Sequence, residues 1–152
     1  MTPNNIDILD PANFYKCKNI WDIEQQPALA KKFYDELTAG NRITYVVQKG
    51  TEYIGEISLV FEMNDPDYTI ADKRVYTSRL IVKANERRKG VGRLLVNHAI
   101  EQAEKMGFTE MSIGVDLNNY PAIKLYTASG FNQITFIGED EQGKYMKLLK
   151  KL

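Results

Sequence analysis

A short basic turn constrains this chain more than any other feature. The run Arg87-Arg88-Lys89-Gly90-Val91-Gly92 lies between an apolar segment at 80–82 and an amphipathic one at 91–106. This order predicts a strand, a turn and a helix. The first turn of a helix carries N–H groups without intrahelical partners at the positive end of the helix dipole, which suits a phosphate. Glycine allows close approach to the backbone, so we predict a site for a pyrophosphate-bearing cofactor.

The remaining pattern predicts an α+β fold in which a mixed sheet carries helices on both faces. Apolar residues at spacings of three and four over 91–106, followed by Gly107, are typical of an amphipathic helix and its end. Strands are predicted at 6–9, 43–48, 53–61, 74–82, 111–115, 132–137 and 144–149. Helices are predicted at 14–37, with a break at Pro27, and at 121–129. Residues 138–143 are predicted as a turn between the last two strands.

Composition limits the classes of partner. A chain of 152 residues is most simply one domain, 1–152. Lys+Arg and Asp+Glu are equal at 20 each, so the charge balance favours neither nucleic acid nor an anionic membrane as partner. The basic turn is therefore a local feature, which favours a small anionic ligand.

The single cysteine, Cys17, excludes an internal disulfide and indicates a reducing compartment. We find no signal-peptide pattern and no apolar run long enough to cross a bilayer, so a cytoplasmic protein is expected. With His98 as the one histidine, no Cys/His metal site is predicted.

Two other phosphate-binding turns do not fit the basic turn. The dinucleotide fingerprint requires glycine where this chain has Arg87. The P-loop requires an ending of Gly-Lys followed by Ser or Thr, which is absent here.

Three motifs in order carry a family resemblance. They are Arg87-x-x-Gly90-x-Gly92, then Asn119-x-x-Ala122-Ile123-x-Leu125-Tyr126, then Gly130-Phe131, four residues after the tyrosine. Together they resemble the GCN5-related N-acetyltransferase (GNAT) superfamily. The resemblance implies a central, mostly antiparallel mixed sheet flanked by helices. It also implies an acetyl-CoA-binding core at 74–131 and a variable acceptor-side region at 1–42.

The resemblance implies acetyl-CoA as donor and a primary amine of a small molecule or peptide as acceptor, with direct transfer. The diphosphate would lie on N–H groups of the turn, and the pantetheine arm would pair with the free edge of the preceding strand. The implied cofactor-binding residues are Leu80, Ile81, Val82, Arg87, Arg88, Lys89, Gly90, Val91, Gly92, Arg93 and Asn119.

Transfer also needs a base, an oxyanion donor and an acid. A lysine-like amine has a pKa near 10.4, so neutralising it at pH 7 costs roughly 4.6 kcal/mol. The family's usual glutamate would lie within 74–82, which has no carboxylate, so Glu56 and Glu62 on the neighbouring strand are our candidate bases, with Tyr76 third. A backbone N–H near Ile81 or Val82 would meet the oxyanion, and the resemblance makes Tyr126 the acid that protonates the leaving thiolate.

Several alternatives stay open at this point. Without a carboxylate on 74–82, a non-catalytic acyl-CoA-binding sensor is the alternative to an enzyme. The acyl-chain preference and the acceptor are not identified, although the acidic loop at 62–72 could attract a cationic amine and Trp21 and Tyr34 could line its site. The last two strands provide a surface that could pair in a homodimer.

Overall fold

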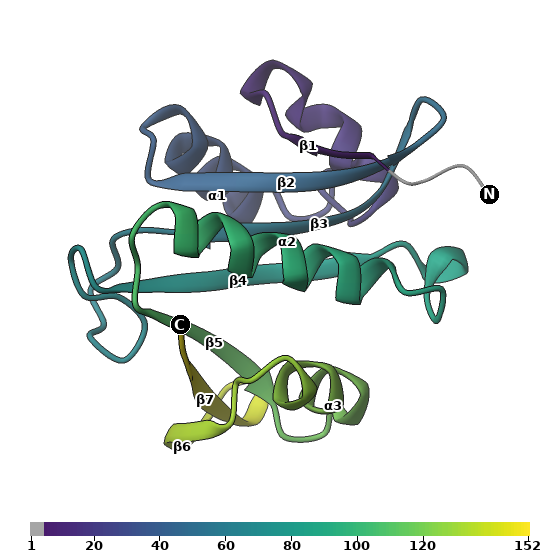
Figure 1. Cartoon of the computed structure of the whole chain (residues 1–152). Helices are drawn as coiled ribbons and strands as arrows, with labels where there is room; N and C mark the ends of the chain where they lie inside the picture. Colours follow the sequence, from purple (N-terminus) through teal and green to yellow (C-terminus); the bar gives the residue numbers. More distant parts are fainter. Residues whose placement is uncertain (1–4) are drawn as a thin grey trace. The chain divides into compact units, whose positions relative to one another are not determined.

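The computed structural model of the chain describes residues 5–152, so residues 1–4 of the predicted acceptor-side region lie outside the described part. Its seven strands follow the order β1-β2-β3-β4-β5-β7-β6 in one sheet. The elements (Figure 1) are β1 Asn5–Ile8, η1 Pro11–Asn19, α1 Pro27–Thr38, β2 Arg42–Lys49, β3 Glu52–Val60, β4 Arg74–Val82, η2 Ala84–Glu86, α2 Val91–Lys105, β5 Glu110–Asp116, α3 Tyr120–Ala128, β6 Gln133–Asp140 and β7 Gly143–Lys151.

The pairing directions confirm the predicted fold class. β1 pairs antiparallel with β2, and β7 pairs antiparallel with both β5 and β6. β4 and β5 run parallel, with Arg74 opposite Glu110 and Thr77 opposite Ile113. A mixed, mostly antiparallel sheet with helices is therefore present. Within residues 5–152, no helix is both long and apolar enough to span a membrane.

The chain divides into two compact units. Unit 1 comprises the residues up to Ser58 together with Arg79–Leu95, and unit 2 comprises Leu59–Ser78 and Val96–Leu152. The expectation of one domain over 1–152 stays a prediction.

Unit 1 has its own apolar core beneath η1 and α1. The buried side chains of this core are Leu9, Cys17, Trp21, Phe33, Leu37, Val46 and Tyr53. Phe33 and Leu37, four residues apart on one face of α1, and Val46 of β2 contribute to it.

Unit 2 is built around β5 and β7, whose inward residues are buried. Met111, Ile113 and Leu148 are each at most 3% exposed. Phe131, which follows α3, is fully buried, and its N–H donates to the carbonyl of Tyr126 at 3.0 Å. Gly130 takes a φ of 101°, so glycine ends the helix and Phe131 folds back on it.

The largest differences from the prediction lie in the first helical region and at the last turn. Residues 14–37 are not one broken α-helix: the first part is the 3-10 helix η1, capped by Asp10, whose Oδ1 accepts from the Ala12 N–H at 3.0 Å. Pro27 begins α1, because its missing N–H costs nothing at a first helical position. The predicted turn 138–143 is shorter, since β6 continues to Asp140 and β7 starts at Gly143.

Candidate functional site

The basic turn at the head of α2 has the geometry of an anion site. Arg88 and Gly90 take left-handed conformations, with φ values of 64° and 86°. The first helical hydrogen bond runs from the Leu94 N–H to the Gly90 carbonyl at 3.0 Å. The N–H groups of Val91, Gly92 and Arg93 therefore have no acceptor within the helix.

Ion pairs at the foot of the turn hold it in place. Glu86 pairs with Lys49 at 3.2 Å and with Lys89 at 3.5 Å. The hydrogen bond from Lys49, followed by the nearby charges, lowers the pKa of Glu86. The Arg87 Nε atom donates to the Val82 carbonyl at 2.9 Å, which ties the turn to the end of β4.

The start of α2 lies very close to β3. A Cβ placed on Gly55 would meet side-chain atoms of Val91 and Leu95 at 3.1 Å each. Glycine at this position therefore sets how near the helix start can approach the strand.

Arg79 lies within β4, just before the predicted pantetheine edge, and has an unusual backbone conformation. Its φ of 60° is left-handed, which is rare for a residue with a side chain and costs of order 1–3 kcal/mol. Such outliers gather at functional sites. The next three residues, Leu80, Ile81 and Val82, are half-buried. No local sequence signal predicted this irregularity, because arginine favours ordinary strand geometry.

Glu56 is buried in unit 1 and is only 5% exposed. The charges of Arg79 and Arg42 act on it. The Arg79 guanidinium lies 4.7 Å from the ring centre of Trp21, and the Arg42 guanidinium lies 4.0 Å from the ring centre of Phe33. Within residues 5–152, the Oε1 atom of Glu56 is buried without a hydrogen-bond partner.

Burial raises the pKa of Glu56 to about 7, against the lowering effect of Arg79 and then Arg42. A carboxyl group with this pKa is divided between acid and base at neutral pH, which is the property that general-base catalysis needs. Glu56 is thus a physically suited base, although its role stays a prediction.

Glu62 does not share this environment. β3 ends at Val60, so the predicted same-face strand position of Glu62 is wrong, and its side chain is exposed. Tyr76, the third candidate, is half-buried in β4 with its ring centre 4.5 Å from that of Tyr68.

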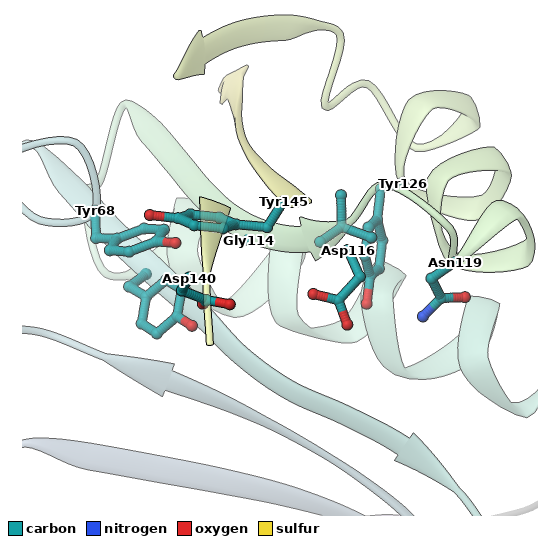
Figure 2. A pocket seen from close by; sticks show the side chains of 9 residues that line it. Tyr68, Gly114, Asp116, Asn119, Tyr126, Asp140 and Tyr145 are labelled. Atoms are coloured by element: carbon teal, nitrogen blue, oxygen red, sulfur yellow. The ribbon is translucent and has the colours of Figure 1, made fainter. Parts of the chain in front are cut away.

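Tyr126 lies in a cavity of about 370 Å³ within unit 2. Figure 2 shows its side chain with Asp116 and Asn119, and shows Tyr68, Tyr145 and Asp140 together elsewhere in the same pocket. Tyr126 is 6% exposed. Burial, and then the nearby Tyr76, raise the pKa of its hydroxyl to about 12. The group is therefore a neutral donor at pH 7.

Local contacts position several residues of the pocket. Asn119 caps α3, since its Oδ1 accepts from the Ala122 N–H at 3.3 Å. A Cβ on Gly114 would lie 2.7 Å from the Tyr68 hydroxyl, so glycine there leaves room for that hydroxyl. Lys147 lies with its Nζ 4.8 Å from the Tyr68 ring centre and pairs with Asp65 at 2.8 Å and Asp67 at 3.1 Å.

Sequence reasoning missed the aromatic and acidic lining of this pocket. Asp140 and Tyr145 flank the turn between β6 and β7, whereas Tyr68 comes from the loop before β4, far earlier in the chain, and no short motif joins them. Among residues 5–152, no group of three His, Cys, Asp or Glu side chains is arranged to hold a metal ion.

Comparison with known proteins agrees with this geometry. N-acetyltransferase family 8 member 3 of Rattus norvegicus is 30% identical over 89 residues, which cover 59% of this chain and 38% of that protein. The [ribosomal protein bS18]-alanine N-acetyltransferase of Escherichia coli K12 is 38% identical over 56 residues, or 37% of this chain and 38% of that protein. The chain thus matches 38% of the length of these curated relatives.

Solved structures share the fold at low identity. The crystal structure of PaiA N-acetyltransferase from Thermoplasma acidophilum in complex with coenzyme A covers 99% of this chain and matches over 100% of its own length, with a TM-score of 0.69 and 17% identity. The profile of the acetyltransferase (GNAT) family matches residues 7–131, which contain the turn, β4 and the Tyr126 motif. This match over most of the sequence shows that the chain belongs to the acetyltransferase (GNAT) family.

Proposed function

We propose that this chain is an N-acetyltransferase that moves an acetyl group from acetyl-CoA to a primary amine by direct attack. The observation that carries the proposal is the turn at the head of α2, with left-handed Arg88 and Gly90 before three unpartnered helical N–H groups. Family membership over residues 7–131 supports it.

The donor would be held by two backbone surfaces. The diphosphate would accept hydrogen bonds from N–H groups between Arg88 and Arg93, where the helix dipole also favours negative charge. Among the described residues, no ion pair engages either of these arginines, so both charges are available to the diphosphate. The pantetheine arm would pair with the edge of β4 at Leu80, Ile81 and Val82. The PaiA N-acetyltransferase of Thermoplasma acidophilum, which has a similar fold, was crystallised in complex with coenzyme A.

The chemistry follows from the protonation states. The neutral amine attacks the thioester carbon, the C–S bond breaks, and the amine proton passes toward Glu56. Because Glu56 is only 5% exposed, the proton would travel through water rather than by direct contact. A backbone N–H near Ile81 would stabilise the oxyanion, and Tyr126 would donate a proton to the departing thiolate. The exposed Glu62 is the weaker choice of base, because it lies beyond the end of β3 and its side chain faces solvent.

The test measures thiol release from acetyl-CoA with a panel of monoamines, polyamines, amino acids and peptides, together with calorimetric titration of coenzyme A. We expect heat on titration and release with at least one amine. Heat without release from any amine would favour the acyl-CoA sensor, and absence of heat with folded protein would overturn both functions. Parallel assays with propionyl- and succinyl-CoA define the acyl preference.

We further propose a homodimer that pairs through β6. This edge strand exposes Ile134 by 54%, Phe136 by 41% and Ile137 by 58%. Light scattering of the wild type and of Ile137→Lys tests it: a mass of two chains that falls to one in the variant is expected. A single-chain mass in the wild type would contradict the dimer.

We also propose a cytoplasmic location, which the buried free thiol of Cys17 supports.

A further inference from the structure

The cavity beside Tyr126 is lined mainly by acidic and aromatic side chains. Its side chains include the carboxylates of Asp116 and Asp140 and the rings of Tyr68, Tyr76 and Tyr145, and none of the lining side chains is cationic. Carboxylates and the faces of aromatic rings both attract cations.

Neither carboxylate is already neutralised. Among residues 5–152, no ion pair involves Asp116 or Asp140, and the side chain of Asp140 only accepts a hydrogen bond from the Gln142 N–H at 2.8 Å. Lys147, which contacts the Tyr68 ring, has its own carboxylate partners in Asp65 and Asp67. The pocket therefore has negative charge that no protein cation balances.

A second observation indicates that a ligand belongs there. Tyr126 is 6% exposed and points into the pocket (Figure 2), yet no described residue between 5 and 152 forms a hydrogen bond with its hydroxyl. The hydroxyl of this largely buried side chain therefore faces the open volume of the pocket, where a ligand can form a hydrogen bond with it.

The reaction itself restricts which charge the ligand carries. The nitrogen that attacks a thioester must be neutral, so it cannot balance a carboxylate during the transfer. Asp140 lies with Tyr68 and Tyr145, apart from the group of Tyr126, Asp116 and Asn119 (Figure 2). A cation at Asp140 is therefore best supplied by a second charged group of the same acceptor.

We propose that this pocket selects small aliphatic diamines and polyamines as acceptors, with the distal ammonium bound by Asp140 and the rings of Tyr68 and Tyr145. The selection rests on the proposed acetyl transfer, because it names the acceptor of that reaction. A cavity of about 370 Å³ is large enough for a short diamine.

The test compares 1,4-diaminobutane with n-butylamine, which has the same carbon chain and lacks the second charge. We expect kcat/KM to be about tenfold higher for the diamine, the combined effect of an exposed ion pair and a cation–π contact. Asp140→Asn keeps the shape and the hydrogen bond to Gln142, and should remove most of this preference without changing KM for acetyl-CoA. Glu139→Gln is the matched control, since it removes the same charge from the adjacent residue, which does not line the pocket.

Measuring diamine binding in the absence of acetyl-CoA separates the proposed diamine site from the proposed acetyl transfer. Calorimetric titration of 1,4-diaminobutane into the wild type, Asp140→Asn and Glu139→Gln needs no acetyl transfer. Weaker binding in Asp140→Asn alone supports the site even if no turnover is found. Equal binding of diamine and monoamine, or equal losses in both variants, overturns the site even if acetyl transfer to other amines is established.

Discussion

Among single residues, Glu56 depends most on its neighbours for its chemistry. The sequence marks it only as a glutamate on a strand, and that position was predicted correctly. Its burial and the approach of Arg79 and Arg42 depend on β4 and β2, which no local pattern connects to it. Glu62, chosen by the same reasoning, lies beyond the end of β3 at Val60, because the two-residue spacing was extended past the point where the strand stops.

The pH dependence of Glu56→Gln tests the raised pKa. Between the ordinary pKa of 4.5 and the folded value of about 7, the folded state holds the proton more tightly than the unfolded state. The free energy of unfolding should therefore fall as pH rises through this window, and urea denaturation should show a flatter dependence for Glu56→Gln. In kinetics, the wild type should gain kcat/KM with an apparent pKa near 7.

The matched variant is Glu62→Gln. It should keep the kinetic rise near neutral pH that Glu56→Gln loses, while both retain any further rise caused by deprotonation of the amine. Loss of the neutral-pH rise in Glu62→Gln alone would assign the base to Glu62 instead.

Tyr126→Phe separates the enzyme from the sensor. The change removes a hydroxyl that has no hydrogen bond with the described residues but keeps the ring packed against Phe131, 6.2 Å between centres. Stability should therefore change little, whereas kcat should fall by roughly 100-fold or more if the hydroxyl is the acid. Steady-state kinetics with calorimetry of coenzyme A measures both quantities. Unchanged kcat would remove Tyr126 from the chemistry.

At the scale of elements, long periodic segments were predicted best. The strand 74–82 and the helix from Val91 were predicted within one residue, because period, glycine stop and flanking turn all agree there. η1 was missed as a 3-10 helix since its apolar residues have no strict period and its cap depends on Asp10 outside the predicted range. The left-handed Arg79 was missed because tertiary contacts, rather than its own preference, impose that conformation.

The turn itself can be tested with two glycines at opposite ends of α2. Gly90 has φ of 86° and Gly107 has φ of 92°, and a Cβ on either would meet nothing within 4 Å. Each change to alanine should therefore cost a similar stability, about 1–2 kcal/mol, from left-handed strain alone. Only Gly90→Ala should weaken coenzyme A binding, by roughly tenfold, since disturbing one charge-assisted hydrogen bond costs about 1.5 kcal/mol. Equal affinities in the two variants, measured by calorimetry, would place the diphosphate elsewhere.

At the scale of the whole molecule, ligand binding should appear as thermal stability. Coenzyme A at 100 times its Kd should add about 2.7 kcal/mol to the free energy of unfolding. For a chain of this size, that gain corresponds to a rise in Tm of roughly 5–10 °C. Differential scanning calorimetry at several ligand concentrations tests it, with adenosine as the control ligand without a diphosphate. A rise with adenosine equal to that with coenzyme A would show that the diphosphate contributes nothing.

The fold class was predictable at this scale because the alternation of strands and helices is explicit in the sequence. The lining of the pocket was not predictable. It gathers residues from β4, β5, α3, β6 and β7 and from the segments before β4 and α3, and no single segment of the sequence encodes their contact.

The ammonium group of Lys147 connects the end of the chain to the loop that carries Tyr68. It comes from β7, lies over the Tyr68 ring and is only 7% exposed, and its bonds to Asp65 and Asp67 fasten that loop. Substitutions in β7 could therefore change which molecules enter the pocket while the basic turn at 87–92 stays unchanged. Sequence differences among close relatives within β7 would then indicate a change in substrate preference.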